Sequence, residues 1–575
     1  MPFTSPQSAR IRIPENHAYD ECVDVNTNLQ SSDMALLYLH PDRTAAAVSG
    51  ESILDRPLPW WVGLAFMLLA LNVPLLATTV PPLTDYPNHL ARCYLLAFGQ
   101  SDPVLSQMFS AHWQIIPNIA VDLLLPMLMH VFSPLTAGRI VLGLCLLLPT
   151  SGAVALSYAY FRRRSFWQIA AGFAAFNALF LMGFMNFELA VGIAMWGAAA
   201  WIYYREIFPA ATVAAGIVLA TLAFFFHLFG FCFYALLVGS YELSVLVGND
   251  FRARPDFRNA AKRAALLAIT LVLPTLLYFT SPLEQVKDAA RWPHIAQKAA
   301  NFFGPFLDYS SAFDILTIIP LIAFLIFCVL QRRARISAAA LIASVVLLVT
   351  YILMPRAMKG TYFLDIRLPI MLGFMVFAGF MPKDLTARQR TTAAVLFAAL
   401  FVARIAFITD VWMHSQRDLD DVRQAIVTVT PGSRVLAADV VCSDNPSWCA
   451  SMPISRSLPE LTPTYWHLAS FVLLDRHAFW PNIFAEDGKQ PIAIKEPYRD
   501  LQAVDSPPVN YTDLALDQVP QKELKRFPFL DHWNQKFDYV LVLNAEGAPN
   551  LDHFLPSELQ LVDHQGIAAL FKVRK

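Results

Sequence analysis

The sequence predicts an α-helical polytopic membrane protein with about eleven transmembrane helices and a C-terminal extracytoplasmic α/β domain. The 575-residue chain is 56% hydrophobic and only 15% charged, whereas soluble domains carry about 25% charged residues. Most of its apolar runs approach the roughly 20 residues that cross a bilayer as a helix. After Thr409 the composition becomes polar, with short strand-like runs. These three observations predict the fold class.

The N-terminal residues 1–55 are polar and lack a sustained periodicity, so we predict a disordered cytoplasmic tail. The first apolar run comes too late for a secretory signal peptide and is long enough to span a membrane. Translation can begin at either Met1 or Met34.

The predicted membrane domain covers residues 56–409. Its apolar runs lie at about 60–78, 137–160, 166–185, 187–204, 208–226, 228–247, 263–280, 312–330, 336–353, 367–381 and 391–409. The run at about 112–132 differs, because it carries Asp122 and is interrupted by Pro117 and Pro126. We predict a helix that lies on the membrane surface there, within a first external loop at 79–136.

The basic residues support this topology. If the segment 112–132 does not cross, every basic cluster lies in the cytoplasm, as the positive-inside rule requires. The clusters are Arg162–Arg164, Arg252–Arg263, Arg332–Arg335 and Lys383–Arg390. The same topology places the N-terminus in the cytoplasm and residues 410–575 outside. In a bacterium this is a multi-pass inner-membrane protein with a periplasmic domain.

The predicted external domain at 410–575 contains short apolar runs bounded by turn-forming residues. They predict strands at 433–439 and 537–544 and a closing hairpin at 559–573. Cys442 and Cys449 lie close together in this domain, and an external compartment is oxidising, so we predict a disulfide. The other cysteines show no metal-ligand spacing.

The candidate site is the polar segment 81–92, directly after the first apolar run. Pro82 and Pro87 prevent that helix from continuing. The segment places a carboxylate, an amide, an imidazole and a guanidinium beside lipid, where each is costly without a partner or a function. Asp85 is the candidate catalytic residue. The alternative is a polar loop that merely ends a helix.

The order of these parts resembles the GT-C class of membrane glycosyltransferases, especially the protein O-mannosyltransferase and aminoarabinose transferase group. In that class an essential Asp or Glu in the first external loop precedes surface helices, and Asp85 matches its position. The segment Lys359–Pro369 resembles the basic external loop that binds the phosphate of a polyprenyl donor. This sequence departs from the family in having a single acid in the first loop and an extra acid, Asp365, in the basic loop.

The resemblance implies that a sugar passes from a polyprenyl-phosphate donor to an envelope glycan, lipid or protein acceptor outside the cytoplasm. Asp85 is then the base that deprotonates the acceptor. The leaving phosphate needs cations, and the candidates that bind it are Lys359, Tyr362, Arg367 and Arg92. The alternative for the external basic residues is anchoring to lipid headgroups.

Three further polar residues are weaker candidates. His89 lies four residues after Asp85, so on a helical turn the two side chains can meet; a packed, hydrogen-bonded histidine is the alternative. Glu188 either binds substrate or a metal, or pairs with Arg92 or Arg139. His227 is flanked by phenylalanines, which favours a core histidine over a ligand.

Other classes of function remain as alternatives. A polysaccharide polymerase or ligase would depend on external arginines and a large late loop. A transporter or flippase would show paired interrupted spans and polar residues at mid-membrane, whereas here the polar residues crowd the external ends. The net charge of −1 gives no basic field for nucleic acid. No cofactor motif is present, and a divalent cation is left open.

Overall fold

The structure, a computed structural model, describes residues 56–247, 257–282, 289–459, 462–503, 506–516, 518–548, 551 and 555–575. The predicted tail at 1–55 and residues 252–256 of the second basic cluster lie outside the described residues. Residues 51–575 form one compact unit.

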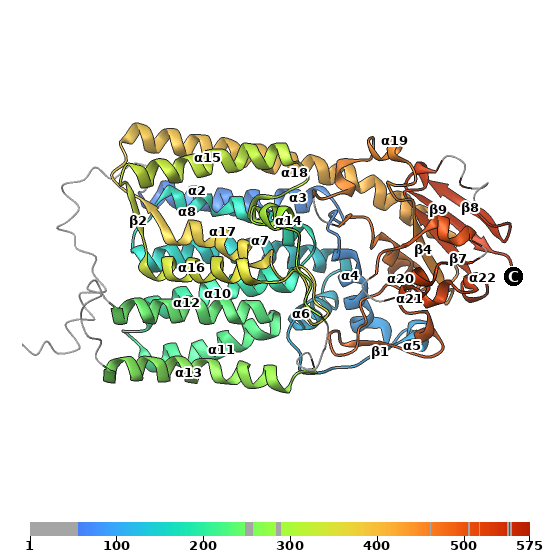
Figure 1. Cartoon of the computed structure of the whole chain (residues 1–575), viewed down its shortest axis with the longest axis horizontal. Coiled ribbons are helices and arrows are strands. Elements are labelled where there is room, and N and C mark those ends of the chain that lie inside the picture. Colours follow the sequence, from blue (N-terminus) through green and yellow to red (C-terminus); the bar gives the residue numbers. More distant parts are fainter. Residues whose placement is uncertain are drawn as a thin grey trace, which may run out of the picture. The chain divides into compact units, whose positions relative to one another are not determined.

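Eight of the described helical segments are long and apolar enough to cross a membrane, and Figure 1 shows them running alongside one another. They are α2–α3 (Pro57–Ala70, Val73–Ala77), α7 (Pro134–Phe161), α10 (Met185–Tyr204), α11 (Pro209–Phe226), α12 (Leu228–Val247), α13 (Phe257–Thr280), α15 (Ser311–Leu330) and α18 (Ala387–Ala425). Two shorter apolar helices, α16 (Ala338–Leu353) and α17 (Arg367–Gly379), match two further predicted spans. The polytopic helical class is confirmed.

The predicted span at 166–185 is not one continuous helix. It consists of α8 (Phe166–Ile169), the 3-10 helix η4 (Ala170–Ala174) and α9 (Ala178–Leu181). The Asn177 side chain accepts hydrogen bonds from the first free N–H groups of α9, which starts a new helix inside an apolar run. Apolar composition alone does not reveal such an internal cap.

The segment 112–132 contains no spanning helix, as predicted, but its helix is shorter than expected. α6 covers only Ala120–Met129, which is too short to cross a bilayer. The preceding strand β1 (Phe109–Ala111) pairs antiparallel with β5 (Ile492–Ile494) of the C-terminal region. The first loop is therefore joined to the end of the chain by a small sheet.

The basic connections gather at one end of the bundle. Strand β2 (Ala334–Ile336) pairs with β3 (Phe380–Pro382), and the Arg164 guanidinium lies 6.0 Å from the centre of the Trp60 ring at the start of α2. In Figure 1 this end lies opposite the C-terminal domain. The described residues of the basic connections thus lie at the end of the bundle away from the C-terminal domain, as the predicted topology requires.

The C-terminal domain contains a five-stranded sheet in the order β6-β4-β7-β9-β8. The strands are β6 (Val509–Asn510), β4 (Val435–Asp439), β7 (Tyr539–Leu543), β9 (Ala568–Val573) and β8 (Leu559–Gln565). β6, β4 and β7 are parallel, and β8 and β9 form the antiparallel hairpin at the edge. Short helices accompany it: α19 (Pro446–Cys449), α20 (Phe471–Arg476), α21 (Gln521–Arg526) and α22 (Trp533–Lys536). The predicted strands and hairpin are all present, and a disulfide joins Cys442 to Cys449.

The last span continues past residue 410, where we expected the domain boundary. α18 has 39 residues and is about 58 Å long, nearly twice the roughly 30 Å of a bilayer core. Near its C-terminal end Asp418 accepts hydrogen bonds of 2.7 and 2.8 Å from Arg456 of the C-terminal domain. The boundary falls inside a continuous helix that both regions share.

A reporter fused after Lys575 tests the orientation of this bundle. We expect a reporter that works only outside the cytoplasm to be active there, because the basic clusters lie at the opposite end. The same reporter placed after Arg164 in a truncated chain should be silent. Activity of a cytoplasm-only reporter after Lys575 would reverse the topology.

Candidate functional site

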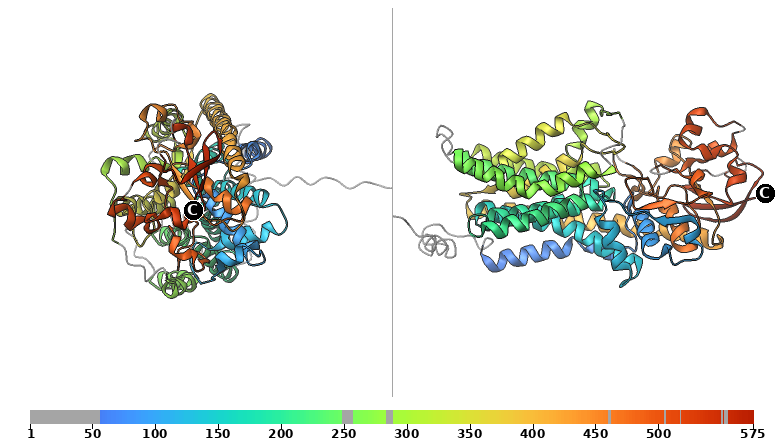
Figure 2. Two further views of the ribbon diagram at one scale, coloured as in Figure 1. Left: turned by 90° about the vertical axis from the view of Figure 1, so that its right-hand side faces the viewer. Right: turned by 90° about the horizontal axis from the view of Figure 1, so that it is seen from below.

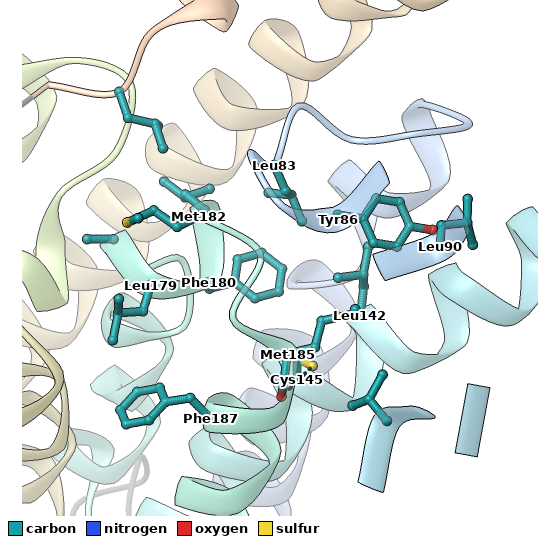
Figure 3. Packing of buried hydrophobic residues seen from close by; sticks show 14 of the residues in the cluster. Leu83, Tyr86, Leu90, Leu142, Cys145, Leu179, Phe180, Met182, Met185 and Phe187 are labelled. Atoms are coloured by element: carbon teal, nitrogen blue, oxygen red, sulfur yellow. Dashed lines mark hydrogen bonds between the residues drawn. The ribbon is translucent and has the colours of Figure 1, made fainter. Parts of the chain in front are cut away.

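Asp85 lies at the start of α4 (Tyr86–Tyr94), directly after the proline-containing turn. Its N–H donates a 3.0 Å hydrogen bond to the carbonyl of Met182. Figure 3 shows its neighbours Leu83 and Tyr86 packed in the buried cluster that includes Met182. The carboxylate itself stays 19% exposed. Hydrophobic packing therefore fixes the backbone while the side chain remains accessible.

Gly183 makes this docking possible. Its φ is +89°, and a Cβ at this position would lie 2.8 Å from the Tyr86 nitrogen and 3.2 Å from that of Asp85. Glycine alone tolerates both the left-handed backbone and the close approach. We did not single out Gly183 from the sequence; its one signal is a lone glycine inside an apolar run.

The C-terminal domain contributes an imidazole that sequence reasoning missed. Nδ1 of His467 donates a 3.0 Å hydrogen bond to the carbonyl of Thr84 and lies 3.5 Å from Oδ1 of Asp85. Burial lowers the pKa of His467 to about 4, against a smaller upward effect of the bond to Thr84. The ring is therefore neutral at neutral pH and contributes no positive charge beside Asp85.

A pair of amide hydrogen bonds, called here the Asn88 clamp, holds the same loop against the C-terminal domain. Asn88 Nδ2 donates to the carbonyl of Asn482 at 2.9 Å, and the Phe484 N–H donates to Asn88 Oδ1 at 2.9 Å. The His89 ring packs edge-on against Phe484, with 5.3 Å between the ring centres. His89 is thus packed, as in the alternative that we gave, but its buried Nδ1 has no hydrogen-bond partner among the described residues. His467 is the imidazole that lies against Asp85.

The Arg92 guanidinium is paired within the protein. It is buried and forms two hydrogen bonds with the Asp122 carboxylate, at 2.7 and 3.0 Å. A bidentate pair of this kind neutralises the arginine and fixes α4 on α6. The partner of Arg92 is therefore Asp122 rather than Glu188, and the binding of a donor phosphate by Arg92 stays a prediction.

The Arg367 guanidinium lies at the start of α17, between two aromatic rings. It is 5.5 Å from the centre of Phe184 and 5.3 Å from that of Phe229, and its side chain is almost fully buried. Asp365 is the nearby acid, but its Oδ2 accepts a hydrogen bond from Asn301. Within the described ranges Arg367 forms no salt bridge with a carboxylate.

Tyr362 and Lys359 occupy the loop before α17. The Tyr362 hydroxyl accepts a 3.2 Å hydrogen bond from Arg291, a second cation that we did not predict. Lys359 and Gly360 both have positive φ, +52° and +64°, which forms a tight turn. Lys489 of the C-terminal domain donates a 2.8 Å hydrogen bond to the Gly360 carbonyl, so this loop is also tied to that domain.

Residues 182–184 connect the acid to the basic loop. Asp85 bonds to Met182, and Arg367 lies over Phe184. Two Cα–Cα steps separate Met182 from Phe184, so their Cα atoms are at most about 7.6 Å apart. The backbone N–H of Asp85 and the guanidinium of Arg367 thus contact the same short turn, although the two residues are far apart in sequence.

The two remaining candidates, Glu188 and His227, are buried among the helices of the bundle. Glu188 is fully buried in the first turn of α10, with Asn177 as its polar neighbour. His227 separates α11 from α12, and its Nδ1 accepts a 3.1 Å hydrogen bond from the Phe229 N–H. Its ring packs edge-on against Phe187, the core environment that its flanking phenylalanines favour. In the described part of the chain no group of three His, Cys, Asp or Glu side chains gathers as a metal-ligand set.

Comparisons with known proteins give only distant likenesses. No protein-family model matches the sequence, and no curated protein matches it. ArnT from Cupriavidus metallidurans bound to undecaprenyl phosphate is similar over 90% of this chain and 98% of its own, with 11% identity and a TM-score of 0.48. The apo oligosaccharyltransferase of Archaeoglobus fulgidus is similar over 84% of this chain and 69% of its own, with 11% identity and a TM-score of 0.42. Both are GT-C membrane glycosyltransferases, but at TM-scores below 0.5 their function does not transfer to this chain.

Substitution of Gly183 by valine should disturb the docking of Asp85. The branched side chain meets backbone atoms at a positive φ, so we expect a loss of about 1–3 kcal/mol in the free energy of unfolding, measured on purified protein in detergent. Gly239→Ala is the control, because a Cβ there meets its nearest neighbour at an ordinary 3.7 Å. Equal stability of the two variants would contradict the docking geometry.

The buried His467 predicts a loss of stability on acidification. The ring's pKa is about 4 in the folded protein, below its ordinary 6.5, so between these values the unfolded chain binds a proton that the folded protein excludes. Stability should therefore be intact above pH 6.5 and fall towards pH 4, by up to about 1.4 kcal/mol per pH unit. His467→Gln should flatten this part of the unfolding profile; an unchanged slope would contradict the prediction.

Proposed function

We propose that this protein transfers a sugar from a polyprenyl-phosphate-linked donor to an acceptor outside the cytoplasm, an envelope glycan, lipid or protein. One observation supports the proposal: Asp85, whose carboxylate is accessible, and Arg367, a buried cation without a carboxylate salt bridge among the described residues, both contact the turn 182–184. A base and a phosphate-binding cation are the two groups that such a transfer requires. The setting proposed for this reaction is the periplasmic side of a bacterial inner membrane.

Asp85 acts as the base in this mechanism. As the acceptor oxygen or nitrogen attacks the anomeric carbon of the sugar, Asp85 takes up its proton. The bond from that carbon to the phosphate oxygen breaks at the same time, and the phosphate leaves with the electron pair. Neutral His467 fixes the loop through Thr84 without neutralising Asp85, so the carboxylate keeps its ability to accept a proton.

Arg367 and Lys359 bind the departing phosphate in this proposal. A buried guanidinium is costly without a counter-charge, and the rings of Phe184 and Phe229 compensate only in part. A phosphate oxygen would supply the missing negative charge. Lys359, at the tip of its turn, can approach the same group, and the Tyr362 hydroxyl adds a polar partner in the same loop.

Asp85→Asn tests the base. The amide keeps the size of the side chain but cannot take up the proton, so we expect sugar transfer to fall at least about a hundredfold. Thermal stability should change by no more than about 0.5 kcal/mol. Asp410→Asn, at an exposed position of α18, is the matched control and should transfer normally. Near-normal transfer by Asp85→Asn would remove Asp85 from the mechanism.

Lys359→Ala and Arg367→Ala test the donor site. Loss of either cation should weaken the binding of a polyprenyl phosphate, measured by thermal shift or by fluorescence with a labelled donor analogue, while expression remains normal. Arg335→Ala removes a cation from the opposite end of the bundle and should bind the donor as the parent does. Unchanged affinity in both loop variants would leave these residues as lipid anchors.

A further inference from the structure

We propose that Tyr309, in the loop before α15, is a positioning residue for Asp85. Its hydroxyl donates a 2.9 Å hydrogen bond to the carbonyl of Pro82, close to Asp85 in the first loop, and the residue is only 2% exposed. This inference rests on the sugar transfer proposed above, because it concerns the carboxylate that acts as the base there. It adds a support for the first loop that comes from the helix bundle rather than from the C-terminal domain.

The two prolines of the segment 81–85 explain why it needs this support. Proline has no N–H group, so Pro81 and Pro82 can form backbone hydrogen bonds only through their carbonyls. The Pro81 carbonyl accepts the N–H of Leu83 within the same turn, at 2.8 Å. The Pro82 carbonyl accepts the Tyr309 hydroxyl. The bond from Tyr309 thus ties the proline pair to a distant segment of the chain.

Buried charged groups fix the backbone on both sides of Tyr309. The Asp308 N–H donates to Asp314 Oδ1 at 2.9 Å, and the Ser310 N–H donates to Asp308 Oδ1 at 2.8 Å. Arg404 of α18 lies against both carboxylates, with Nη1 2.8 Å from Asp308 Oδ2 and 3.4 Å from Asp314 Oδ1. Removing one partner of a buried ion pair is strongly destabilising. The backbone at Tyr309 is therefore held by α15 and α18, independently of the first loop.

Trp412 of α18 orients the Tyr309 hydroxyl. The Trp412 Nε1 donates a 3.0 Å hydrogen bond to the hydroxyl oxygen, and the Trp412 side chain is fully buried. An indole N–H can only donate, so the hydroxyl proton is directed to the Pro82 carbonyl. A phenylalanine at position 309 would therefore remove two hydrogen bonds and leave this carbonyl without its partner.

The hydrogen bond at Pro82 acts on Asp85 through a short, constrained backbone. The N–H groups of Thr84 and Asp85 donate to the turn 181–184, so Tyr309 holds one end of the segment and this turn holds the other. A base must lie within hydrogen-bond reach of the proton that it takes up, and a misplacement of about 1 Å can cost about a hundredfold in rate. Because the proposed phosphate ligands lie in and beside another loop, removal of the Tyr309 hydroxyl should slow transfer without weakening donor binding.

Tyr309→Phe tests the proposal in the full-length protein in detergent. Hydrogen–deuterium exchange of peptides from the first loop that contain Asp85 should become about fivefold faster, the change that loss of one hydrogen bond produces. Sugar transfer should fall by about tenfold to a hundredfold, whereas binding of a polyprenyl phosphate should match that of the parent. Tyr234→Phe is the matched control and should change none of the three, because Tyr234 is 0% exposed and its hydroxyl has no hydrogen-bond partner among the described residues.

A double variant of Tyr309→Phe and Asp85→Asn separates positioning from general destabilisation. If Tyr309 acts through Asp85, loss of its hydroxyl should reduce transfer no further once the base is absent. Losses that add in the double variant would overturn the proposal, and so would parent-level transfer or parent-level loop exchange in Tyr309→Phe. The exchange measurement needs no activity. A parent protein without sugar transfer would therefore contradict the proposed function, while loop exchange would still decide whether Tyr309 holds the segment that contains Asp85.

Discussion

The docking of the first loop, residues 79–136, on the turn 181–184 is the constraint on which the rest of the site depends. A loop at the edge of the hydrocarbon region must satisfy its backbone groups within the protein. Here the N–H groups of Thr84 and Asp85 donate to the carbonyls of Leu181 and Met182. These two backbone hydrogen bonds fix the backbone of Asp85, and with it the point from which the carboxylate extends.

The docking also explains why several unrelated segments converge. Gly183 leaves room for the backbone of the loop. The ring of Phe184 packs against the Arg367 guanidinium, and the Asn88 clamp joins the loop to the C-terminal domain by two hydrogen bonds. Figure 2 shows that domain beside the first-loop segments at one end of the bundle.

Local patterns in the sequence predicted the elements, but not their pairing. The spans, the strands at 435–439 and 539–543, and the placement of an acid after the first span all follow from composition and from residues a few positions apart. The sequence did not single out His467 and Arg291, because their partners are far away along the chain. His467 contacts Thr84 and Asp85 of the first loop, and Arg291 donates to Tyr362. The Arg92–Asp122 pair was not predicted for the same reason. Without knowledge of its partner, the charge of Arg92 and its position near Asp85 indicated a residue that binds phosphate. The break near Asn177 was hidden because the run is uniformly apolar.

The Asn88 clamp has a consequence for biosynthesis. One half of it lies in the first loop, and the other half, Asn482 and Phe484, is synthesised only after all the helices that can span a membrane. During translation Asp85 is therefore made long before the imidazole of His467 and before the contacts that support its loop. The first loop reaches its final geometry only when the C-terminal domain has folded against it.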